Sequence, residues 1–526
     1  MDLHGIKETY NAAVRFVDQN VAEGRGEKVA VYYNDTTLTY AEVQKKVNQF
    51  GNALKQKGID LEDRILMICH DTPAFIISFF GAIKIGAVPT PVNTLMQPSD
   101  FEYFLNYSRA KALVVEADIW QKIAHLRERF IFLKHVIVIG SQETEPGCDR
   151  FDALLDGQDT TLDPAPTVYD DAGFWLFSSG STGNPKGAVH LQHDMEYSYD
   201  HYGKQVLQIT EEDITFSASK LFFAYGLGNG LYFPFGAGAS TVLLGERPTP
   251  ESVFETIEQY RPTIFFGVPT LYGAMLNYMN QSGKTYDLSS LRICVSAGEA
   301  LPASLYNRWK DAFQVDILDG IGSTEAAHIY LSNRIGDIRP GSTGKPVPGY
   351  EVKIVDLDGN PVPVNEPGDL YVKGDSLAEC YWNMHEKNKK QFLGDWYYTG
   401  DKYYQDEDGY YWYFGRSDDM LKVSGIWVSP IEIENTLMEH EDVLEVAVIG
   451  VETEDRLVKP KAYVVLRETA APSKELEGEL KQFVKDRLAP YKYPRIIEFT
   501  DSLPKTATGK IQRFQLRAKE KDLVEQ

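Results

Sequence analysis

A cluster of glycine, serine and threonine residues with one lysine, at residues 178–187, has the composition of a phosphate-binding turn. It reads Ser-Ser-Gly-Ser-Thr-Gly-Asn-Pro-Lys-Gly and follows the apolar run Phe174–Phe177. Glycine lets backbone N–H groups approach phosphate oxygens because no Cβ blocks them. Hydroxyl groups add donors and a lysine adds charge. The predicted phosphate-binding residues are Ser178, Ser179, Gly180, Ser181, Thr182, Gly183 and Lys186.

This turn differs from the phosphate loop of P-loop nucleoside triphosphatases. Their loop ends in Gly-Lys-Ser/Thr at the start of a helix, whereas Pro185 precedes Lys186 here and Gly187-Ala188 follow it. The Gly-x-Gly-x-x-Gly pattern of dinucleotide-binding folds does not occur in the stretch either. An ordinary surface turn is the remaining alternative, and six consecutive Ser, Thr and Gly residues argue against it.

Four further segments carry carboxylates or cations that a nucleotide could use. A carboxylate oxygen suits Mg²⁺, which prefers hard oxygen ligands, and a carboxylate suits a vicinal diol because both of its oxygens accept hydrogen bonds. A lysine suits a reaction in which two anions meet, since charge grows on the attacked phosphorus. Taken singly, each segment also has an ordinary interpretation as a helix cap, a β-turn, a solvated linker or a surface lysine. The segments are Asp319–Glu325, Trp396–Asp401, Gly415–Gly425 and Pro504–Lys510.

In this order and spacing the five segments resemble the signatures of the adenylate-forming superfamily, across essentially the whole chain. That superfamily comprises acyl-CoA ligases, peptide-synthetase adenylation domains and beetle luciferases. The resemblance implies that the chain binds ATP, Mg²⁺ and coenzyme A. It also implies that an acid is first joined to AMP and then transferred to the CoA thiol.

The resemblance also implies roles for single residues. Thr324 would contact phosphate, Glu325 would hold Mg²⁺, and Asp401 would accept hydrogen bonds from both ribose hydroxyls. Lys510 would contact the acyl carboxylate and the α-phosphate. Asp418 would be the hinge, and Gly425 would line the pantetheine tunnel. At the position of Ile321 many relatives carry an aromatic residue against the adenine. The remaining nucleotide-binding residues would be Gly298 and Glu299 of the loop Ser296–Ala300, Asp319, Gly320, Ile321 and Arg416.

The amino-acid sequence around the predicted acid pocket resembles that of benzoate–CoA ligases in particular. The pocket would lie between Leu221–Gly230, Phe265–Leu271 and Gly322–Ile329, which are apolar and aromatic. The first two contain no Asp or Lys, which disfavours an amino-acid substrate. The resemblance places Lys422 near the carboxylate of the bound acid. It implies that the aromatic ring of the acid is surrounded by Ala224, Tyr225, Gly322, His328 and Ile329.

Benzoate is the favoured substrate, but related acids fit the same outline. One methylene is worth only about 1–3 kcal/mol of discrimination, so a substituted benzoate or an alicyclic acid such as cyclohexanecarboxylate is an alternative. A luciferase-like oxygenase that uses the adenylate is an alternative from another class. A non-catalytic scaffold is disfavoured because Lys510, Glu325 and Asp401 are all present.

The elements that must position these residues follow an α/β pattern. A capping box at Thr39–Glu42 opens a helical stretch, and strand-like runs then alternate with helical ones, which indicates parallel sheets. Expected strands include 64–69, 86–92, 112–116, 136–139, 240–244, 263–267 and 292–297. Short alternating runs after about residue 340 indicate a small β region.

We therefore predict an α/β fold with two domains. A large N-terminal domain, 1–416, would combine several subdomains: parallel sheets with helices plus the small β region. A small, mobile α+β C-terminal domain, 417–526, would move about a hinge near Asp418. Its expected elements are a helix at 430–440, strands at 443–451 and 460–466, and a helix at 474–488.

Composition sets the remaining expectations. The 526-residue chain has a net charge of −23, which argues against nucleic acid as the main partner because duplex binding needs a basic face. Residues 485–521 are locally basic, with ten Lys/Arg against four Asp/Glu. Four scattered cysteines form no Cys-x-x-Cys pair, which is typical of free thiols in a reducing cytosol. We expect a cytoplasmic protein without a membrane-spanning segment, and the sequence leaves open whether it forms a homodimer.

Overall fold

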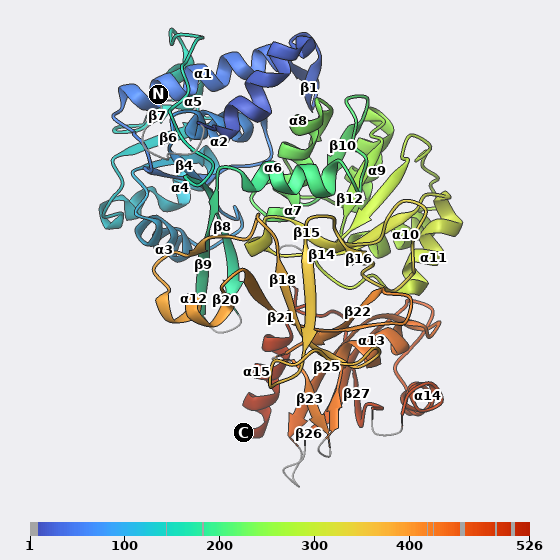
Figure 1. Cartoon of the computed structure of the whole chain (residues 1–526). Coiled ribbons are helices and arrows are strands. Elements are labelled where there is room, and N and C mark those ends of the chain that lie inside the picture. Colours follow the sequence, from blue (N-terminus) through green and yellow to red (C-terminus); the bar gives the residue numbers. More distant parts are fainter. Residues whose placement is uncertain are drawn as a thin grey trace.

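The computed structural model describes residues 9–143, 145–180, 183–417, 419–423, 426–452, 458–489, 492–505 and 511–525. Two large, mostly parallel sheets lie beside each other in the upper part of the molecule. A smaller antiparallel sheet lies beneath them, and the C-terminal elements, orange to red, form the lower part (Figure 1). The predicted α/β fold with a small C-terminal α+β unit is confirmed.

The first sheet is parallel throughout, with strand order β4-β3-β5-β6-β7. The predicted capping box opens its first helix: the Glu42 N–H donates to Thr39 Oγ1, and the Thr39 N–H donates to the Glu42 carboxylate. Its strands are β3 (Arg64–Ile68), β4 (Val88–Pro91), β5 (Ala112–Glu116), β6 (His135–Ile139) and β7 (Asp149–Arg150). Its helices are α1 (Tyr40–Gln56), α2 (Pro73–Lys84), α3 (Pro98–Ser108), α4 (Ala117–Ile123) and α5 (Phe151–Leu155).

The second sheet has nine strands, in the order β16-β15-β14-β13-β12-β10-β11-β1-β2. The inner strands are parallel, so the carboxyl ends of β12, β13 and β14 meet at one edge, where open α/β sheets bind ligands. Its strands are β1 (Val29–Tyr33), β2 (Thr36–Thr39), β10 (Ile214–Ser217), β11 (Ser240–Leu243), β12 (Ile264–Gly267), β13 (Ile293–Ser296), β14 (Ile317–Gly322), β15 (Ile329–Ser332) and β16 (Lys345–Pro346). Its helices are α6 (Asp194–Ser198), α7 (Ala224–Leu227), α8 (Phe233–Ala237), α9 (Pro250–Tyr260), α10 (Pro269–Ser282) and α11 (Ala303–Phe313).

Two smaller antiparallel sheets complete the part before residue 417. One is a long hairpin, β8 (Ala172–Gly180) and β9 (Gly183–Leu191), extended by β19 (Cys380–Tyr381). The other is the β region expected after residue 340, with α12 (His385–Gln391) beside it. Its strands are β17 (Glu351–Val355), β18 (Gly368–Lys373), β20 (Phe392–Leu393), β21 (Trp396–Gln405) and β22 (Tyr411–Arg416).

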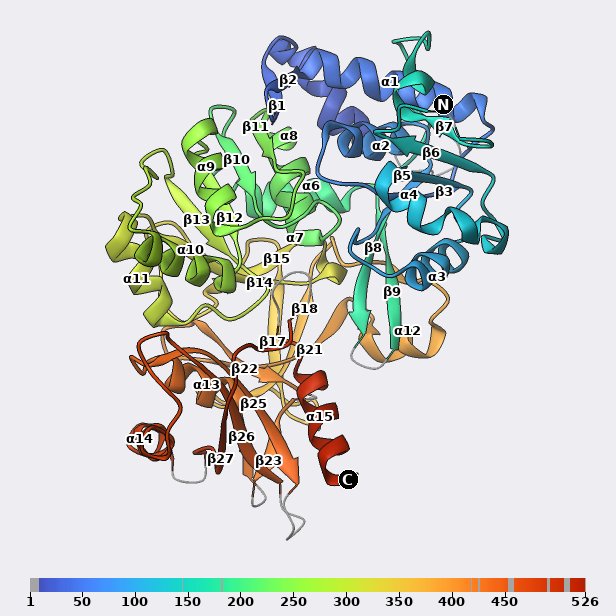
Figure 2. The same ribbon diagram turned by 180° about the vertical axis from the view of Figure 1, so that it is seen from behind.

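The C-terminal unit has its own apolar core and a sheet in the order β25-β26-β27. Seen from behind, its last helix, α15, lies beside β25 (Figure 2). In the described part of the chain, no helix is both long and apolar enough to cross a membrane. The elements of this unit are β23 (Leu421–Val423), β24 (Ile426–Val428), α13 (Pro430–Met438), β25 (Val443–Glu452), β26 (Val458–Leu466), α14 (Lys474–Lys485), β27 (Ile496–Phe499) and α15 (Arg513–Glu525).

Candidate active site

The predicted phosphate-binding turn joins the two strands of the β8–β9 hairpin, in which Ser178 pairs with Lys186. A strand follows the turn, whereas a helix follows the loop of a P-loop protein. Ser181 and Thr182 lie outside the described residues, and only the backbone is described at Ser179, Gly180 and Gly183. The described end of this turn therefore presents Ser178 and Lys186 on neighbouring strands.

Both side chains converge on the buried carboxylate of Glu325, although 139 residues or more separate them from it in sequence. Ser178 Oγ donates to Glu325 Oε1 at 2.8 Å, and Lys186 Nζ lies 3.5 Å from the same oxygen. Burial opposes ionisation of Glu325, yet the Lys186 ammonium and the hydrogen bonds to Glu325 hold the pKa of its carboxyl below the usual range. Burial in turn lowers the pKa of Lys186. An ionised carboxylate therefore lies at the phosphate turn.

Tyr381 completes this cluster, and the sequence analysis did not single it out. Its hydroxyl donates to Glu325 Oε1 at 2.7 Å, and the Lys186 ammonium lies 4.3 Å from the centre of its ring. The Tyr397 hydroxyl lies 3.2 Å from that of Tyr381. Strand β19 places Tyr381 there by pairing it with Ala188 of β9. No local motif marks Tyr381, because only this strand pairing brings it to the turn.

Glu325 belongs to a short turn whose backbone is held from several directions. Residues Thr324–Ala326 form one turn of 3₁₀-helix, and the side chain of Ser323 caps it. Ala327 follows with φ of +61°, a left-handed conformation that costs free energy in a residue other than glycine. Groups from other segments contact four successive carbonyls of this turn. His190 Nε2 lies 2.8 Å from Thr324 O, and the Ala378 N–H donates to Glu325 O at 2.7 Å. Ser376 Oγ donates to Ala326 O at 2.9 Å, and Tyr232 OH donates to Ala327 O at 3.2 Å.

The predicted ribose-binding aspartate is paired with the predicted nucleotide-binding arginine. Asp401 of β21 lies opposite Arg416 of β22, and Arg416 Nη1 lies 3.1 Å from both Asp401 Oδ1 and the Thr399 carbonyl. Gly400, with φ of +75°, lies directly under the guanidinium, where an added Cβ would stand 2.9 Å from Arg416 Nη2. Glycine is therefore favoured here by backbone conformation, and an added Cβ would displace the Arg416 guanidinium.

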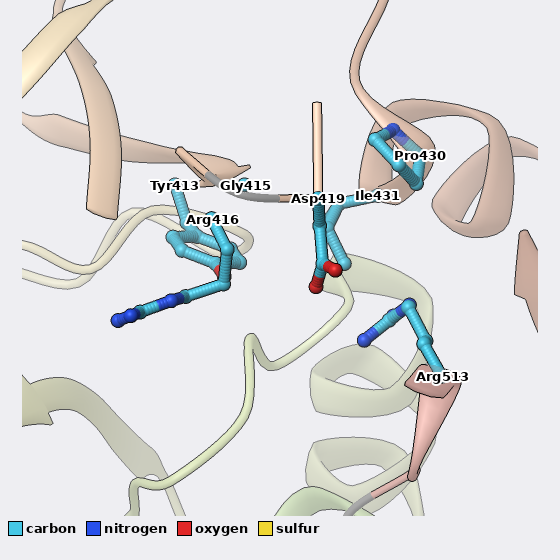
Figure 3. A pocket seen from close by; sticks show the side chains of 7 residues that line it. All are labelled: Tyr413, Gly415, Arg416, Asp419, Pro430, Ile431 and Arg513. Carbon is cyan, nitrogen blue, oxygen red and sulfur yellow. The ribbon is translucent and has the colours of Figure 1, made fainter. Parts of the chain in front are cut away.

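Next to Arg416, a small pocket lies where the C-terminal unit begins (Figure 3). Arg513, at the start of α15, points toward Asp419 and donates to Glu434, while Arg416 points away from both. Arg517 forms an ion pair of 2.6 Å with Asp419. Residues that follow the segment 506–510 are thus tied to the start of the C-terminal unit, next to the predicted hinge.

The predicted adenine wall lies at the carboxyl ends of β13 and β14. Ser296 and Asp319 are register partners there, and Ile321 is half-buried. Gly298 is exposed and has a left-handed φ of +91°. Gly320 lies on β14 with them, and Glu299 is half-buried. Burial raises the pKa of Asp319 to about 8, so this side chain is largely protonated at neutral pH.

The predicted acid pocket residues come together around His328. The rings of Tyr225 and His328 lie 5.6 Å apart, and Ala224 and Ile329 are buried beside them. Burial lowers the pKa of His328 to about 3, so its imidazole is neutral. At Gly322 an added Cβ would lie 2.3 Å from the His328 carbonyl, so only glycine allows this close approach. The sequence analysis did not single out three further neighbours of the His328 ring. Asn229 Oδ1 lies 3.0 Å from His328 Nε2, and the ring centres of Phe233 and Tyr202 lie 4.5 Å and 5.3 Å from that of His328.

Several predicted residues remain expectations. Asp418, Gly425 and Lys510 lie outside the described residues, and of Lys422 the structure describes the backbone within β23 but not the side chain. The predicted hinge, tunnel and acyl-phosphate lysine are therefore not located here.

Comparison with known proteins yields full-length matches. The family model for AMP-binding enzymes matches residues 18–382, and the model for the C-terminal domain of AMP-binding enzymes matches residues 432–510. Benzoate–CoA ligase of Thauera aromatica is 50% identical over 98% of this chain and 97% of its own length. A crystal structure of the anthranilate CoA ligase AuaEII with anthranoyl-AMP matches with a TM-score of 0.94 at 44% identity, covering all of both chains. A benzoate CoA ligase from Burkholderia xenovorans LB400 matches with a TM-score of 0.89 at 45% identity, covering 97% of this chain and 100% of its own.

Proposed function

The chain belongs to the family of AMP-binding enzymes, and we propose that it is an AMP-forming ligase joining benzoate to coenzyme A. The observation that carries the proposal is the convergence of Ser178, Lys186 and Glu325 at the predicted phosphate turn. The residues predicted to bind the acid gather nearby, around a neutral His328. The names of the similar proteins, ligases for benzoate and anthranilate, support an aromatic acid as the substrate.

In the first step, a carboxylate oxygen of the acid attacks the α-phosphorus of ATP. The new bond is P–O, the bond from the α-phosphorus to the bridging oxygen breaks, and pyrophosphate leaves. Thr324 and Lys186 are suited to hold phosphate oxygens, because one offers a hydroxyl and the other a charged donor. Asp401 is suited to the ribose hydroxyls. The role of Lys510 is to offset the negative charge that develops at phosphorus.

The residues present fit a magnesium ion. Mg²⁺ is commonly held by one or two carboxylates together with substrate phosphates, and Glu325 is an ionised, buried carboxylate at the phosphate turn. Over the described ranges, no group of three or more His, Cys, Asp or Glu side chains could hold a metal by itself. Bound there with the nucleotide, Mg²⁺ would neutralise phosphate charge.

In the second step, the thiolate of coenzyme A attacks the acyl carbon. A C–S bond forms, the bond from the acyl carbon to the AMP oxygen breaks, and AMP leaves. Between the steps, residues 417–526 would rotate on residues 1–416 about Asp418. The rotation would withdraw Lys510 and bring up the face that runs from Lys422 to Gly425. The ion pair of Arg517 with Asp419 links α15 to this predicted hinge.

Benzoate is preferred over larger or charged acids by the character of the pocket. The neutral imidazole of His328 and the rings of Tyr225 and Phe233 offer apolar walls. Acids of similar size and shape to benzoate are also candidate substrates, since small changes in substrate size alter binding by only about 1–3 kcal/mol. The similar ligase AuaEII was crystallised with anthranoyl-AMP, the adenylate of an amino-substituted benzoate, which supports including substituted benzoates.

The decisive experiment is a panel of acids assayed with ATP and coenzyme A, with AMP and ADP measured separately. The panel contains benzoate, 2-, 3- and 4-substituted benzoates, cyclohexanecarboxylate and acetate. We expect AMP, pyrophosphate and a thioester in equal amounts, with benzoate giving the highest kcat/KM. Formation of ADP in place of AMP would refute the mechanism. Product formation that requires oxygen would favour the luciferase-like alternative.

A further inference from the structure

The imidazole of His190 is fully buried and contacts an oxygen atom through each of its nitrogens. Nδ1 lies 2.7 Å from Asp194 Oδ2, and Nε2 lies 2.8 Å from the carbonyl oxygen of Thr324. His190 and Asp194 both have no exposed surface. The ring is stacked on Phe174 at a centroid distance of 4.8 Å, which fixes its plane. His190 stands on β9, four residues after Lys186, so one strand carries both contacts to the phosphate site.

The geometry determines where protons must lie. A carbonyl oxygen only accepts hydrogen bonds, so Nε2 must carry a proton for its contact with Thr324. Asp194 Oδ2 also accepts the N–H of Leu191 at 3.1 Å. If Nδ1 and the carboxylate were both deprotonated, two lone pairs would face each other at 2.7 Å in a site without water access. A second proton therefore lies between Nδ1 and Oδ2, whichever of the two atoms holds it.

We propose that His190, through this proton shared with Asp194, is a positioning residue that holds the Thr324 carbonyl and thereby aims the Thr324–Glu325 turn at the nucleotide. The shared proton matters because a neutral histidine beside an ionised aspartate would keep its proton on Nδ1. Nε2 would then be bare and would repel the carbonyl of Thr324. The consequence for the proposed ligase reaction, on which this inference rests, is that Asp194 keeps His190 a donor toward the turn.

Adjacent contacts define what His190 contributes. The Ala378 N–H, Ser376 and Tyr232 hold the next three carbonyls of the turn, so loss of His190 affects its first residue only. The Thr324 carbonyl would keep the longer contact with the Ala327 N–H, at 3.3 Å within the turn. That residue, Thr324, is the one predicted to contact phosphate. We therefore expect loss of the His190 contact to affect turnover with ATP more than the stability of the fold.

Two substitutions separate the two nitrogens. In His190→Gln the amide nitrogen falls near the position of Nε2, so the donor to Thr324 is kept while the partner of Asp194 is lost. In His190→Asn the amide falls near Nδ1, so Asp194 keeps a partner. The Thr324 carbonyl then loses its side-chain donor and keeps only the Ala327 N–H, at 3.3 Å. We expect kcat for ATP–pyrophosphate exchange with benzoate to be roughly tenfold lower in H190N than in H190Q, because only H190Q keeps a side-chain donor for the buried Thr324 carbonyl. The KM for benzoate should be similar in both variants.

A matched control is His440→Gln in the C-terminal unit, where a buried histidine lies beside Glu479, far from the turn in the sequence. H440Q should leave exchange unchanged. Equal losses in H190Q and H190N, or a greater loss in H190Q, would overturn the proposal and assign His190 to stability alone. No loss in either variant would overturn it too.

Nitrogen-15 NMR of histidine-labelled wild-type protein tests the proton arrangement without any substrate. The signal of His190 is assigned by its disappearance in H190Q. We expect a proton on Nε2 at neutral pH and a strongly deshielded proton between Nδ1 and Asp194. A bare Nε2 would overturn the proposal, whatever the exchange rates of the two variants are. This result stands whether or not the protein activates benzoate, so failure of the proposed function is recognised separately, by the acid panel.

Discussion

The hydroxyl of Tyr381 donates to Glu325 Oε1, the same oxygen that Ser178 and Lys186 contact. The tyrosine thus fixes a carboxylate predicted to face Mg²⁺ and, through its ring, supports the ammonium predicted to face phosphate. The two groups with opposite charges would each take a partner from the bound nucleotide. Tyr381 would keep both in place while their mutual contact is exchanged for contacts with substrate.

Removal of this hydroxyl should weaken the use of magnesium and ATP. In Tyr381→Phe, we expect kcat/KM for ATP to fall about tenfold, the cost of one hydrogen bond to a charged group. The Mg²⁺ concentration needed for half-maximal stabilisation by ATP in a thermal unfolding assay should rise as well. This second measurement does not depend on turnover.

Tyr403→Phe is the matched control for that change. Tyr403 is also buried, and its hydroxyl contacts Thr343 rather than Glu325. If both variants shift the Mg²⁺ requirement alike, Tyr381 acts only through general stability.

Substitution of Gly400 should impair nucleotide binding although every predicted nucleotide-binding side chain is kept. Gly400→Ala places a Cβ 2.9 Å from the Arg416 guanidinium at a left-handed φ, which strains the turn and displaces Arg416 from Asp401. We expect Kd for AMP, measured by calorimetry, to rise about tenfold. Gly394→Ala is a suitable control, because its φ is also left-handed but no atom lies within 4 Å of the added carbon. An unchanged Kd in G400A would show that the Asp401–Arg416 pair does not bind the nucleotide.

His328 should make the free energy of unfolding depend on pH. Its folded pKa of about 3 lies below the ordinary 6.5, so between these values the unfolded chain binds a proton that the folded chain does not. Stability from this group is therefore lost as pH falls below about 6.5, by up to about 1.4 kcal/mol per pH unit. His328→Phe should remove this slope. Urea unfolding at pH 7 and pH 5 measures it as the difference between wild type and variant.

Taking that difference is necessary because other buried groups act in the opposite direction. Burial raises the pKa of Glu116 to about 7 and that of Asp71 to about 6, so these carboxyls favour the folded state as pH falls. Both carboxyls are present in the wild type and in the variant, so their contributions to the free energy of unfolding cancel in the difference. A difference that does not change between pH 7 and pH 5 would contradict a buried neutral imidazole.

Lys510→Ala should slow the first proposed step far more than the second. We expect formation of benzoyl-AMP to fall at least about a hundredfold, since a charged group facing developing negative charge is removed. Transfer of supplied benzoyl-AMP to coenzyme A should change less than about threefold. Equal losses in both steps would contradict the assignment of Lys510 to the first step alone.

Much of the fold could be predicted because hydrophobic pattern and caps determine it locally. The strands expected at 112–116 and 136–139 have the predicted type, and the capping box at Thr39 opens α1 as expected. Boundaries moved by a few residues at element ends, as at the C-terminal helix expected over 474–488, which ends at Lys485. Pairing between distant strands carries no such local signal, and the nine-stranded order was not predicted.

The site shows the same division. Ser178, Lys186, Glu325, Asp401 and Arg416 belong to recognisable segments, and the structure places them in two contact groups. Tyr381, His190 and Asp194 were missed. Tyr381 reaches Glu325 only because β19 pairs with β9, and His190, which Asp194 contacts, meets the Thr324 carbonyl only in the folded chain. A buried histidine four residues before an aspartate at the end of a strand was the one available signal.

The residue sequence Glu325-Ala326-Ala327-His328 joins the phosphate site to the acid pocket within four positions, with strained Ala327 between them. Anyone redesigning this protein for a new acid will want to change His328 first. Such a change alters the neighbour of a backbone already under torsional stress, which the Tyr232 hydroxyl helps to restrain through the Ala327 carbonyl. Substrate range and rate of adenylation should therefore be difficult to tune independently from this wall, and libraries that leave Tyr232 untouched while varying Tyr225 or Phe233 should yield more active variants.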